Sequence, residues 1–530
     1  MDYISILSFI GFTALVGIIA YFKTRSTDET SSKGYFLGGR SLTAGVIAGS
    51  LLLTNLSTEQ IVGLNGQAYE QGLLVFSWET LAAIAMVVTA IFLLPRYLKG
   101  GLTTVPQFLE KRFDTTTKSI TSFLFLSGYA IILLPIVLYS GSLAFVTMFD
   151  LPVRFGVSHD VAIWICVWAI GIIGSVYAIF GGLKAVAVSD SINAIGLLIG
   201  GLMIPVFGLY IVGDGSLGEG ISTLYNSNPD KFDATGTEDS YIPLSTLFTG
   251  MMLVQLFYWG TNQAIIQRAL GAKNLAEGQK GLLLAAIFKI LGPLIVVIPG
   301  IIAYHLYSGE ITNADQAYPY LVKQVLPAPL LGFFAAVLFG AILSSFNSAL
   351  NSSVTLFGID IYRTHFKKEA SDSEVVKKGK AFGILLAIFA MLIAPFIANM
   401  GSLFAYLQEV NGMYSIPILT IILVGYSTKY VPAKAAKIGL FLGMGLYGLS
   451  QFVIKPFIVG EDNYPHFLHI MAILFVLNVI IMLIIGKLSP RKEAFEIEYT
   501  NEVEILPYKH VKAVGLAICL IVLSLYVIFT

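Results

Sequence analysis

The chain alternates between long apolar runs and short polar connections from one end to the other. Most runs hold roughly 20 residues, which is the length that an α-helix needs to cross a bilayer. We count fourteen such spans: 3–22, 44–71, 73–95, 119–148, 160–181, 185–213, 243–267, 281–307, 326–362, 381–399, 402–427, 435–457, 465–486 and 511–529. The run at 326–362 exceeds one bilayer thickness, so it is either a long tilted helix or begins as a surface helix.

Composition supports an all-α polytopic membrane protein. Of the 530 residues, 56% are hydrophobic and 12% are charged, whereas soluble domains carry about twice that charged fraction. The first run follows Asp2 and has no small-residue cleavage site, so we expect a retained span rather than a signal peptide. Cys166 and Cys519, the two cysteines, both lie in apolar runs, which excludes a disulfide framework.

The distribution of basic residues predicts the orientation. Of the 32 lysines and arginines, 27 lie in alternate loops, which include 23–40, 96–118 and 268–280. The opposite loops hold only Arg154, Lys231, Lys323 and Lys455, and Lys289 lies within a span. Because cytoplasmic loops are enriched in Lys and Arg, this split places both termini outside.

One span is unusually polar. Residues 51–72 read "LLLTNLSTEQIVGLNGQAYEQG", and such a stretch is expected to face the bundle interior, with a helix interruption near Leu53–Leu56. Small polar residues also join helices without any further role. The carboxyl of Glu59 beside Gln60 favours a functional site instead, because intramembrane carboxyls are costly.

A second span resembles the first. Residues 255–268 read "QLFYWGTNQAIIQR", and both spans contain Thr-Asn followed by Gln. The two lie five spans apart, so the second copy is inverted in the membrane. Broken helices at matching positions of two inverted halves indicate a transporter site near the bilayer midplane.

Other polar side chains in apolar runs extend this prediction. Glu79, Lys289 and Gln408 lie within spans, and residues 340–353 read "GAILSSFNSALNSS". Hydroxyl and carbonyl oxygens suit a hard monovalent cation such as Na⁺ rather than zinc or copper, although helix packing by small residues explains the same pattern. Asp190 lies one or two turns inside a span, either as a functional group or as a carboxylate that reaches the surface.

Five segments resemble the sodium:solute symporter family: "TNLSTEQIVG", "YFLGGRSL", "FYWGTNQAIIQRAL", "GGLKAVAVSDSIN" and "ILSSFNSALNS". The resemblance covers nearly the whole chain and implies a LeuT-like fold with two inverted five-helix repeats. It implies an extra helix and cytoplasmic loop at 1–43, a first repeat at 44–213, an outer loop at 214–242, a second repeat at 243–427 and three additional helices at 428–530.

The resemblance also implies roles for individual residues. Solute contacts fall on Gln60, Glu79, Gln255, Lys289 and Gln408, with Glu59 as local support. Gates fall on Leu64, Trp78, Tyr258 and Phe404. Sodium ligands fall on the backbone carbonyls of Leu53, Leu56 and Ala341 and the hydroxyls of Ser344 and Ser345, and Asp190 matches a position linked to a further cation in some members.

Three positions depart from the family pattern. Ala82 replaces a serine that bonds the sugar in galactose transport, Gln255 replaces an asparagine, and Asn193 replaces a glutamine. The missing hydroxyl at Ala82 argues against naming galactose as the solute.

The sequence therefore predicts a sodium-coupled symporter for a sugar or sugar-like solute in the bacterial cytoplasmic membrane. The alternative is a symporter of the same fold that carries an organic acid or amino acid, driven by sodium or by protons. An enzyme is not expected, because histidine and cysteine are scarce in the spans, and no segment resembles a nucleic-acid-binding patch.

Overall fold

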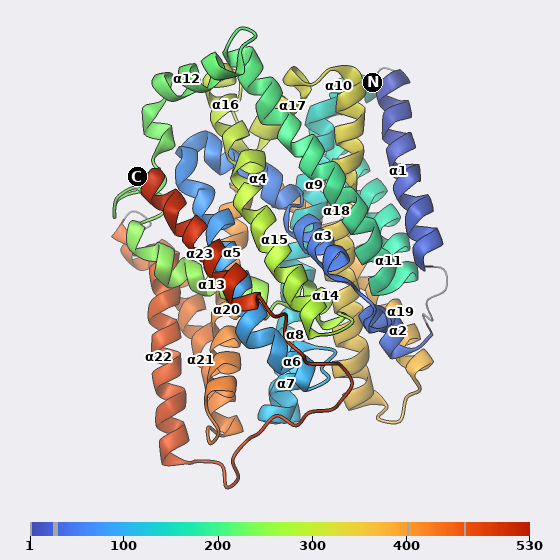
Figure 1. The fold of residues 1–530 in the computed structure, drawn as a ribbon, viewed down its shortest axis with the longest axis vertical. Coiled ribbons are helices and arrows are strands. Elements are labelled where there is room, and N and C mark those ends of the chain that lie inside the picture. The colour runs from blue at the N-terminus through green and yellow to red at the C-terminus, as the bar shows by residue number, and fades with distance from the viewer. Residues whose placement is uncertain (1–2, 25–29, 400–401, 461–462, 530) are drawn as a thin grey trace.

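The computed structural model describes residues 3–24, 30–399, 402–460 and 463–529, which form a bundle of helices (Figure 1). The helices of the first half are α1 (Tyr3–Thr24), α2 (Ser32–Leu37), α3 (Ala44–Asn55), α4 (Thr58–Gln71), α5 (Ser77–Val88), α6 (Leu94–Lys99), α7 (Val105–Arg112), α8 (Thr115–Gly128), α9 (Leu134–Phe149), α10 (Leu151–Phe155), α11 (His159–Val212) and α12 (Leu217–Ser227). Those of the second half are α13 (Met252–Gly260), α14 (Gln263–Leu270), α15 (Leu275–Val296), α16 (Ile298–Tyr307), α17 (Ala317–Val325), α18 (Ala328–Thr355), α19 (Asp372–Ile393), α20 (Leu403–Ser427), α21 (Ala433–Leu449), α22 (Phe467–Leu488) and α23 (Val511–Ile528).

Twelve helical stretches of the described chain are long and apolar enough to cross a membrane. Two of the predicted spans, 44–71 and 243–267, are not single long helices because each is interrupted. The first breaks between α3 and α4, where Ser57 has an extended backbone. The second breaks between α13 and α14 at Thr261 and Asn262. Both interruptions lie at the Thr-Asn sequence, as predicted.

Two other stretches are joined in the structure, one without a break and one through a kink. The run at 326–362 is one long helix, because α18 continues through a π-helical segment, Leu356–Phe366, without a break. The predicted spans 160–181 and 185–213 are the two parts of α11, joined at a kink where Gly182 has φ of 57°. A glycine is required there, because that backbone conformation disfavours a side chain.

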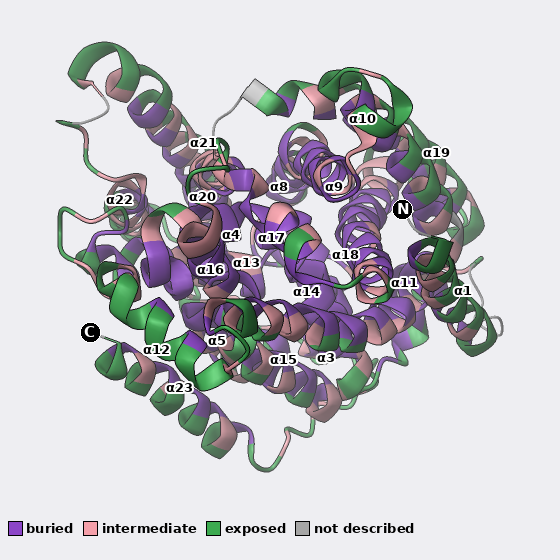
Figure 2. Cartoon of the chain, turned by 90° about the horizontal axis from the view of Figure 1, so that it is seen from above, coloured by how far each residue is buried: buried purple, intermediate pink, exposed green. Residues whose placement is uncertain are grey.

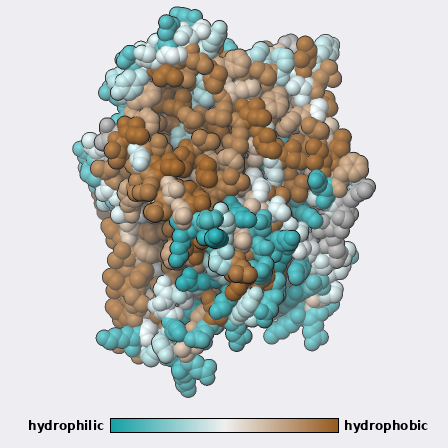
Figure 3. All heavy atoms as spheres, viewed as in Figure 1, coloured by the Kyte–Doolittle hydropathy of each residue, from teal (hydrophilic) through white to brown (hydrophobic). Residues whose placement is uncertain are grey.

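The outer helices present their apolar side chains outward, as a protein in a bilayer does. Viewed from above, the central helices are buried, whereas α1, α19, α22 and α23 carry exposed residues (Figure 2). Large apolar side chains on these helices are open, including Leu7, Leu385, Leu488 and Val527. Apolar side chains cover a broad band of the face in Figure 3, and hydrophilic ones gather over its lower part and along its upper edge.

The segment between α22 and α23 crosses the lower face as an extended strap, residues 489–510 (Figure 1). Backbone hydrogen bonds attach it to three connections: from Phe495 to the carbonyl of Lys429, from Thr500 to that of Lys99, and from Leu275 to that of Glu504. The strap therefore joins the C-terminal helices to the connections of both halves.

Several basic residues counted in the predicted inner loops are buried. Arg112 is fully buried and donates to the carbonyls of Gly425, Val431 and Thr428. Arg268 was assigned to a loop, and this is wrong: it lies in α14 with 1% of its surface exposed. The loop count missed it because the α13–α14 break shifts the helix end toward Leu270.

Candidate functional site

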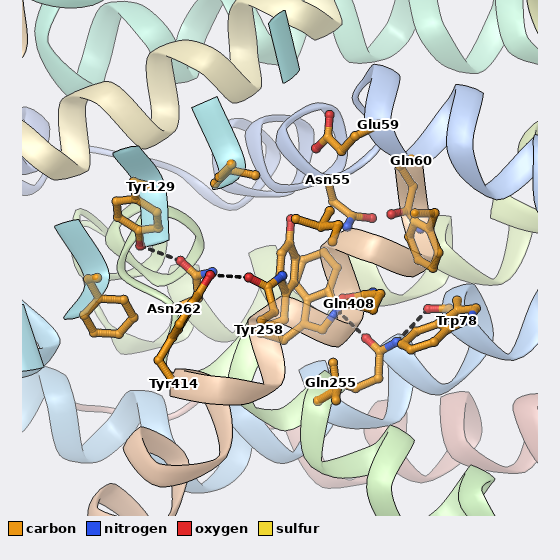
Figure 4. A pocket seen from close by; sticks show the side chains of 17 residues that line it. Asn55, Glu59, Gln60, Trp78, Tyr129, Gln255, Tyr258, Asn262, Gln408 and Tyr414 are labelled. Carbon is orange, nitrogen blue, oxygen red and sulfur yellow. Dashed lines mark hydrogen bonds between the residues drawn. The ribbon is translucent and has the colours of Figure 1, made fainter. Parts of the chain in front are cut away.

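A cavity lies where the two broken helices meet α5 and α20. Asn55, Glu59 and Gln60 reach it from the α3–α4 break, and Gln255 and Tyr258 reach it from α13 (Figure 4). Each break leaves backbone groups without the hydrogen bonds that a continuous helix would give them. At membrane depth such a break is tolerated where neighbouring protein or a water-filled cavity supplies hydrogen bonds to those groups.

Lys289, Glu79 and Gln60 form a connected group beside this cavity. The Lys289 ammonium pairs with the Glu79 carboxylate and also donates to Asn55 Oδ1. Gln60 donates to Glu79 Oε1 at 2.6 Å. Glu79 is 0% and Lys289 is 1% exposed, so no bulk water screens the pair. The group has no room for a side chain at Gly292, whose Cβ would overlap Glu79 Oε2.

The remaining predicted solute contacts line the cavity among aromatic rings. Gln255 donates to the Trp78 carbonyl at 2.8 Å and accepts a hydrogen bond from Trp259 at 3.2 Å. Gln408 lines the cavity from α20 (Figure 4). The Lys289 ammonium lies 5.8 Å from the centre of the Trp259 ring, so that the ring also faces the charge.

Three of the four predicted gate residues line the cavity. The rings of Trp78 and Phe404 meet edge to face, with centroids 5.2 Å apart. Tyr258 also lines the cavity and lies between Trp78 and Tyr129 in the view of Figure 4. Leu64 is fully buried but does not line the cavity; it lies on α4 next to Gly63, whose hydrogen faces the backbone of Phe404.

The cavity has a second polar end that the sequence reasoning missed. Tyr129 donates to Asn262 Oδ1 at 2.7 Å and Tyr414 donates to Asn411 (Figure 4). Asn262 was visible as part of the Thr-Asn match between the two broken spans. Nothing in the sequence marked Tyr129, because its run is apolar.

The two serines among the predicted sodium ligands contact Thr54, so that α18 meets α3 at this point. Ser345 donates to the Thr54 carbonyl at 2.6 Å, and the Ser344 hydroxyl lies 3.1 Å from Thr54 Oγ1. Leu53 on α3 and Ala341 on α18 are 0% exposed, and so is Leu56 just after the end of α3. The oxygen donors are neutral, which suits a weakly held monovalent cation.

Asp190 lies beside this group and does not reach the surface. It is 2% exposed on α11 and accepts a hydrogen bond from Ser50 at 2.7 Å. The alternative of a surface carboxylate is therefore wrong: the α11 kink turns this part of the helix toward α3.

Glu59 is the remaining acid of the cavity. Its carboxylate accepts a hydrogen bond from Ser57, and the described part of the chain offers it no ion pair. Of the positions that depart from the family pattern, Ala82 is buried at 1% exposure, and Asn193 packs against Gly340, where a Cβ would meet its amide.

On the side of the loop 308–325, Asp315 anchors the start of α20. Its Oδ2 accepts the backbone N–H of Leu403 at 3.2 Å, one residue before the gate residue Phe404. Burial raises the pKa of Asp315 to about 7, against the lowering effect of that hydrogen bond. The carboxyl thus changes charge near neutral pH at the base of a predicted gate.

A buried polar cavity at two interrupted helices of a membrane bundle defines a secondary transporter. The sequence model of the sodium:solute symporter family matches residues 35–443. The chain therefore belongs to the sodium:solute symporter family: it is a multi-pass membrane protein that uses Na⁺ as the coupling ion, and it is not an enzyme.

Relatives that match most of the chain support this family assignment. An uncharacterized symporter, YidK of Escherichia coli K12, is 47% identical over 99% of this chain and 91% of its own length. The sodium/glucose cotransporter of Vibrio parahaemolyticus is 34% identical over 83% of both chains. The sodium/myo-inositol cotransporter 2 of Sus scrofa is 29% identical over 87% of this chain and 73% of its own.

Solved structures show the same fold. A substrate-bound, outward-open Na⁺-coupled sialic acid symporter aligns with a TM-score of 0.79 at 20% identity, covering 93% of this chain and 99% of its own. Mhp1, a nucleobase-cation-symport-1 family transporter, aligns with a TM-score of 0.55 at 16% identity, covering 86% and 95%. These neighbours support the predicted all-helical, LeuT-like fold.

Proposed function

We propose that the protein uses a sodium gradient to take up a neutral, polyhydroxylated solute, a sugar or a close relative, across the bacterial cytoplasmic membrane. One observation carries this proposal: the only cation among the predicted solute contacts, Lys289, is already paired with Glu79 and Asn55 beside the cavity, and neither Lys289 nor Glu79 lines it. The other predicted contacts, Gln60, Gln255 and Gln408, are neutral amides.

The pairing favours a neutral solute over an anion. A sugar acid would have to compete with Glu79 for the ammonium, and the carboxylate of Glu59 in the same cavity would repel it. Amides both donate and accept, as solute hydroxyls do. The rings of Trp78 and Trp259 offer flat apolar faces for the carbon-bound hydrogens of a sugar ring.

The names of the relatives point the same way, since they include a sodium/glucose and a sodium/myo-inositol cotransporter. Ala82 supplies no hydroxyl where the family pattern places a serine, so we do not assign galactose. The proposed contacts are Gln60, Glu79, Gln255, Lys289 and Gln408, and the proposed gates are Leu64, Trp78, Tyr258 and Phe404.

Sodium binding would link the first broken helix to α18. The proposed ligands are the carbonyls of Leu53, Leu56 and Ala341 and the hydroxyls of Ser344 and Ser345, with Asp190 as a position for a second cation. An ion there ties α3 to α18 and stabilises the arrangement in which the α3–α4 break faces the solute. By linkage, sodium and solute must tighten each other by the same factor.

We further propose fourteen spans in two inverted repeats with both termini outside. The broken pairs α3–α4 and α13–α14 each count as one span, and the stretch Thr58–Lys99 contains α4, a turn at Gly72 and the following span. In support, Ser5 near the N-terminus bonds the Ala328 carbonyl, and Phe529 near the C-terminus accepts from Ala234 in the loop 214–242. The first contact falls at the start of the predicted span 326–362, and the second falls on the connection 214–242, which is predicted to be outside.

The test is uptake into proteoliposomes of labelled glucose, galactose, myo-inositol, sialic acid and proline, with sodium and pH gradients imposed separately. We expect uptake of a neutral hexose or cyclitol under a sodium gradient and none under a pH gradient alone. Preferred uptake of sialic acid or proline would refute the solute assignment, and uptake driven by protons alone would refute the coupling.

Variants test the position of the site. Gln408→Ala is expected to weaken solute binding by about tenfold or more, because an amide of the cavity loses its hydrogen bonds to solute. The matched control is Gln451→Ala, since Gln451 is also buried but lies beyond α21, outside the cavity. Equal affinities in the two variants would show that the solute binds elsewhere.

A further inference from the structure

Arg268 is a buried cation that the proposed transport scheme leaves without a role. It lies on α14, the second piece of the second broken span, and is 1% exposed. Its helix packs beside α3 and α18 near the centre of the bundle (Figure 1). Buried charges in a membrane bundle are expensive and mark function more often than packing.

The guanidinium reaches the hydroxyl groups that surround the proposed sodium site. Nε of Arg268 donates to Ser50 Oγ on α3 at 3.1 Å, and one terminal nitrogen donates to Ser348 Oγ on α18. The other terminal nitrogen donates to the carbonyl of Ala264 on its own helix. No ion pair to Arg268 is found among the residues that the structure describes.

Short hydrogen-bond paths connect these hydroxyls to proposed cation positions: two hydrogen bonds from Ser348 to the Ser344 hydroxyl, through Thr54, and one from Ser50 to Asp190. Ser348 Oγ lies 3.2 Å from Thr54 Oγ1, which in turn lies 3.1 Å from Ser344 Oγ. On the other side, Ser50 donates to Asp190 Oδ2 at 2.7 Å. The hydroxyls of Ser50 and Ser348 thus contact the guanidinium on one side and connect to the proposed cation positions on the other.

We propose that Arg268 is a tethered cation that stands in for sodium when the site empties. Without sodium, the guanidinium holds α3, α14 and α18 together through Ser50 and Ser348 and balances the charge of Asp190, so that the empty carrier returns to the outward state. Sodium arriving between Ser344 and Ser345 repels the guanidinium across a dry interior and weakens its hold on Ser348. This inference rests on the proposed sodium site.

The proposed role of Arg268 affects net uptake and solute exchange differently. Net uptake requires the empty carrier to return, whereas exchange of labelled for unlabelled solute with sodium on both sides does not. Arg268→Gln should therefore lower sodium-driven net uptake by about tenfold or more while exchange continues. It should also lower the sodium concentration that half-saturates equilibrium ²²Na binding by about tenfold, because a nearby like charge is gone. Arg268→Lys keeps the charge, so its half-saturation should stay near that of the unmodified protein.

The matched control is Arg112→Gln, which removes an equally buried arginine that bonds backbone carbonyls away from the sodium site. A loss of packing alone would lower net uptake and exchange together, as expected for this control. Equal loss of both modes in Arg268→Gln, or unchanged sodium half-saturation, would overturn the inference. If Arg268→Gln does not fold, the measurements on Arg268→Lys test the inference instead. A parallel fall of net uptake and exchange, or a changed sodium concentration at half-saturation, would refute the inference.

Different results would refute the proposed function and the proposed role of Arg268. An unmodified protein without sodium-driven uptake would refute the function and this inference with it. Sodium-driven uptake that is unchanged in Ser344→Ala/Ser345→Ala would refute the sodium site, and hence the surrogate role of Arg268, while leaving the symporter assignment intact.

Discussion

Separating the Lys289–Glu79 pair is the perturbation that most directly tests the site. Glu79→Gln leaves the ammonium without its carboxylate, and Lys289→Met leaves the carboxylate without its cation. Both groups are almost completely buried, so neither remaining charge can be solvated without opening the cavity wall. Removing one partner of a buried pair costs about 3–5 kcal/mol.

The magnitude translates into thermal stability. For a chain of 530 residues the unfolding entropy gives a shift of roughly 1 °C per kcal/mol, so each single variant should lower the unfolding midpoint by ~3–5 °C. The double variant Glu79→Gln/Lys289→Met contains no unpaired charge, so its loss should be smaller than the sum of the single losses. We expect a coupling energy of at least about 2 kcal/mol from this cycle.

The assay is thermal unfolding of purified protein in lipid nanodiscs, followed by equilibrium binding of the solute identified by the uptake panel. All three variants should lose solute binding, since Gln60 also depends on Glu79. Additive stability losses would show that the two charges do not interact in the folded protein. Retained affinity in Glu79→Gln would place the solute elsewhere.

Three further outcomes follow from the geometry. Ser344→Ala/Ser345→Ala should raise the sodium concentration that half-saturates uptake by roughly tenfold or more, whereas Ser353→Ala, whose hydroxyl bonds only within its own helix turn, should leave it unchanged; equal effects would reject the ligand assignment. Phe404→Ala removes a ring contact worth about 0.5–1.5 kcal/mol, so labelling of a cysteine placed in the cavity from outside should become several-fold faster, and an unchanged rate would mean that this ring does not gate. Burial raises the pKa of Asp315 to about 7, so the folded protein holds a proton there that the unfolded chain releases near pH 4; stability contributed by this group is present below about pH 4 and is lost as pH rises toward 7. The difference in melting temperature between the unmodified protein and Asp315→Asn should therefore change over that window, and a constant difference would refute the prediction.

Much of the fold could be read from the sequence because membrane spans are strongly constrained. Runs of about 20 apolar residues were enough to locate most of the long helices, whereas the orientation read from the loop charges stays a prediction. The polar residues of 51–72 located the first break, because a continuous lipid-facing helix cannot carry them. The second break was found by its likeness to the first, and both lie at the Thr-Asn sequence.

The site was readable only in part. Gln60, Glu79 and Lys289 stood out because polar groups are rare in apolar runs, yet their direct pairing depends on the approach of α5 and α15, which no local pattern encodes. Tyr129 was missed because an aromatic residue in an apolar run carries no signal. Arg268 was misassigned because loop counting assumes that basic residues near a span end face the cytoplasm.

The two interruptions have an electrostatic consequence beyond flexibility. Every helix end carries roughly half an elementary charge, negative at its C-terminus and positive at its N-terminus. The C-terminal end of α3 falls at Asn55, in the middle of the protein, so the backbone itself places negative potential beside Ser344 and Ser345. Part of the attraction for a cation is therefore fixed by the path of the chain, and replacing side chains reduces that attraction without abolishing it.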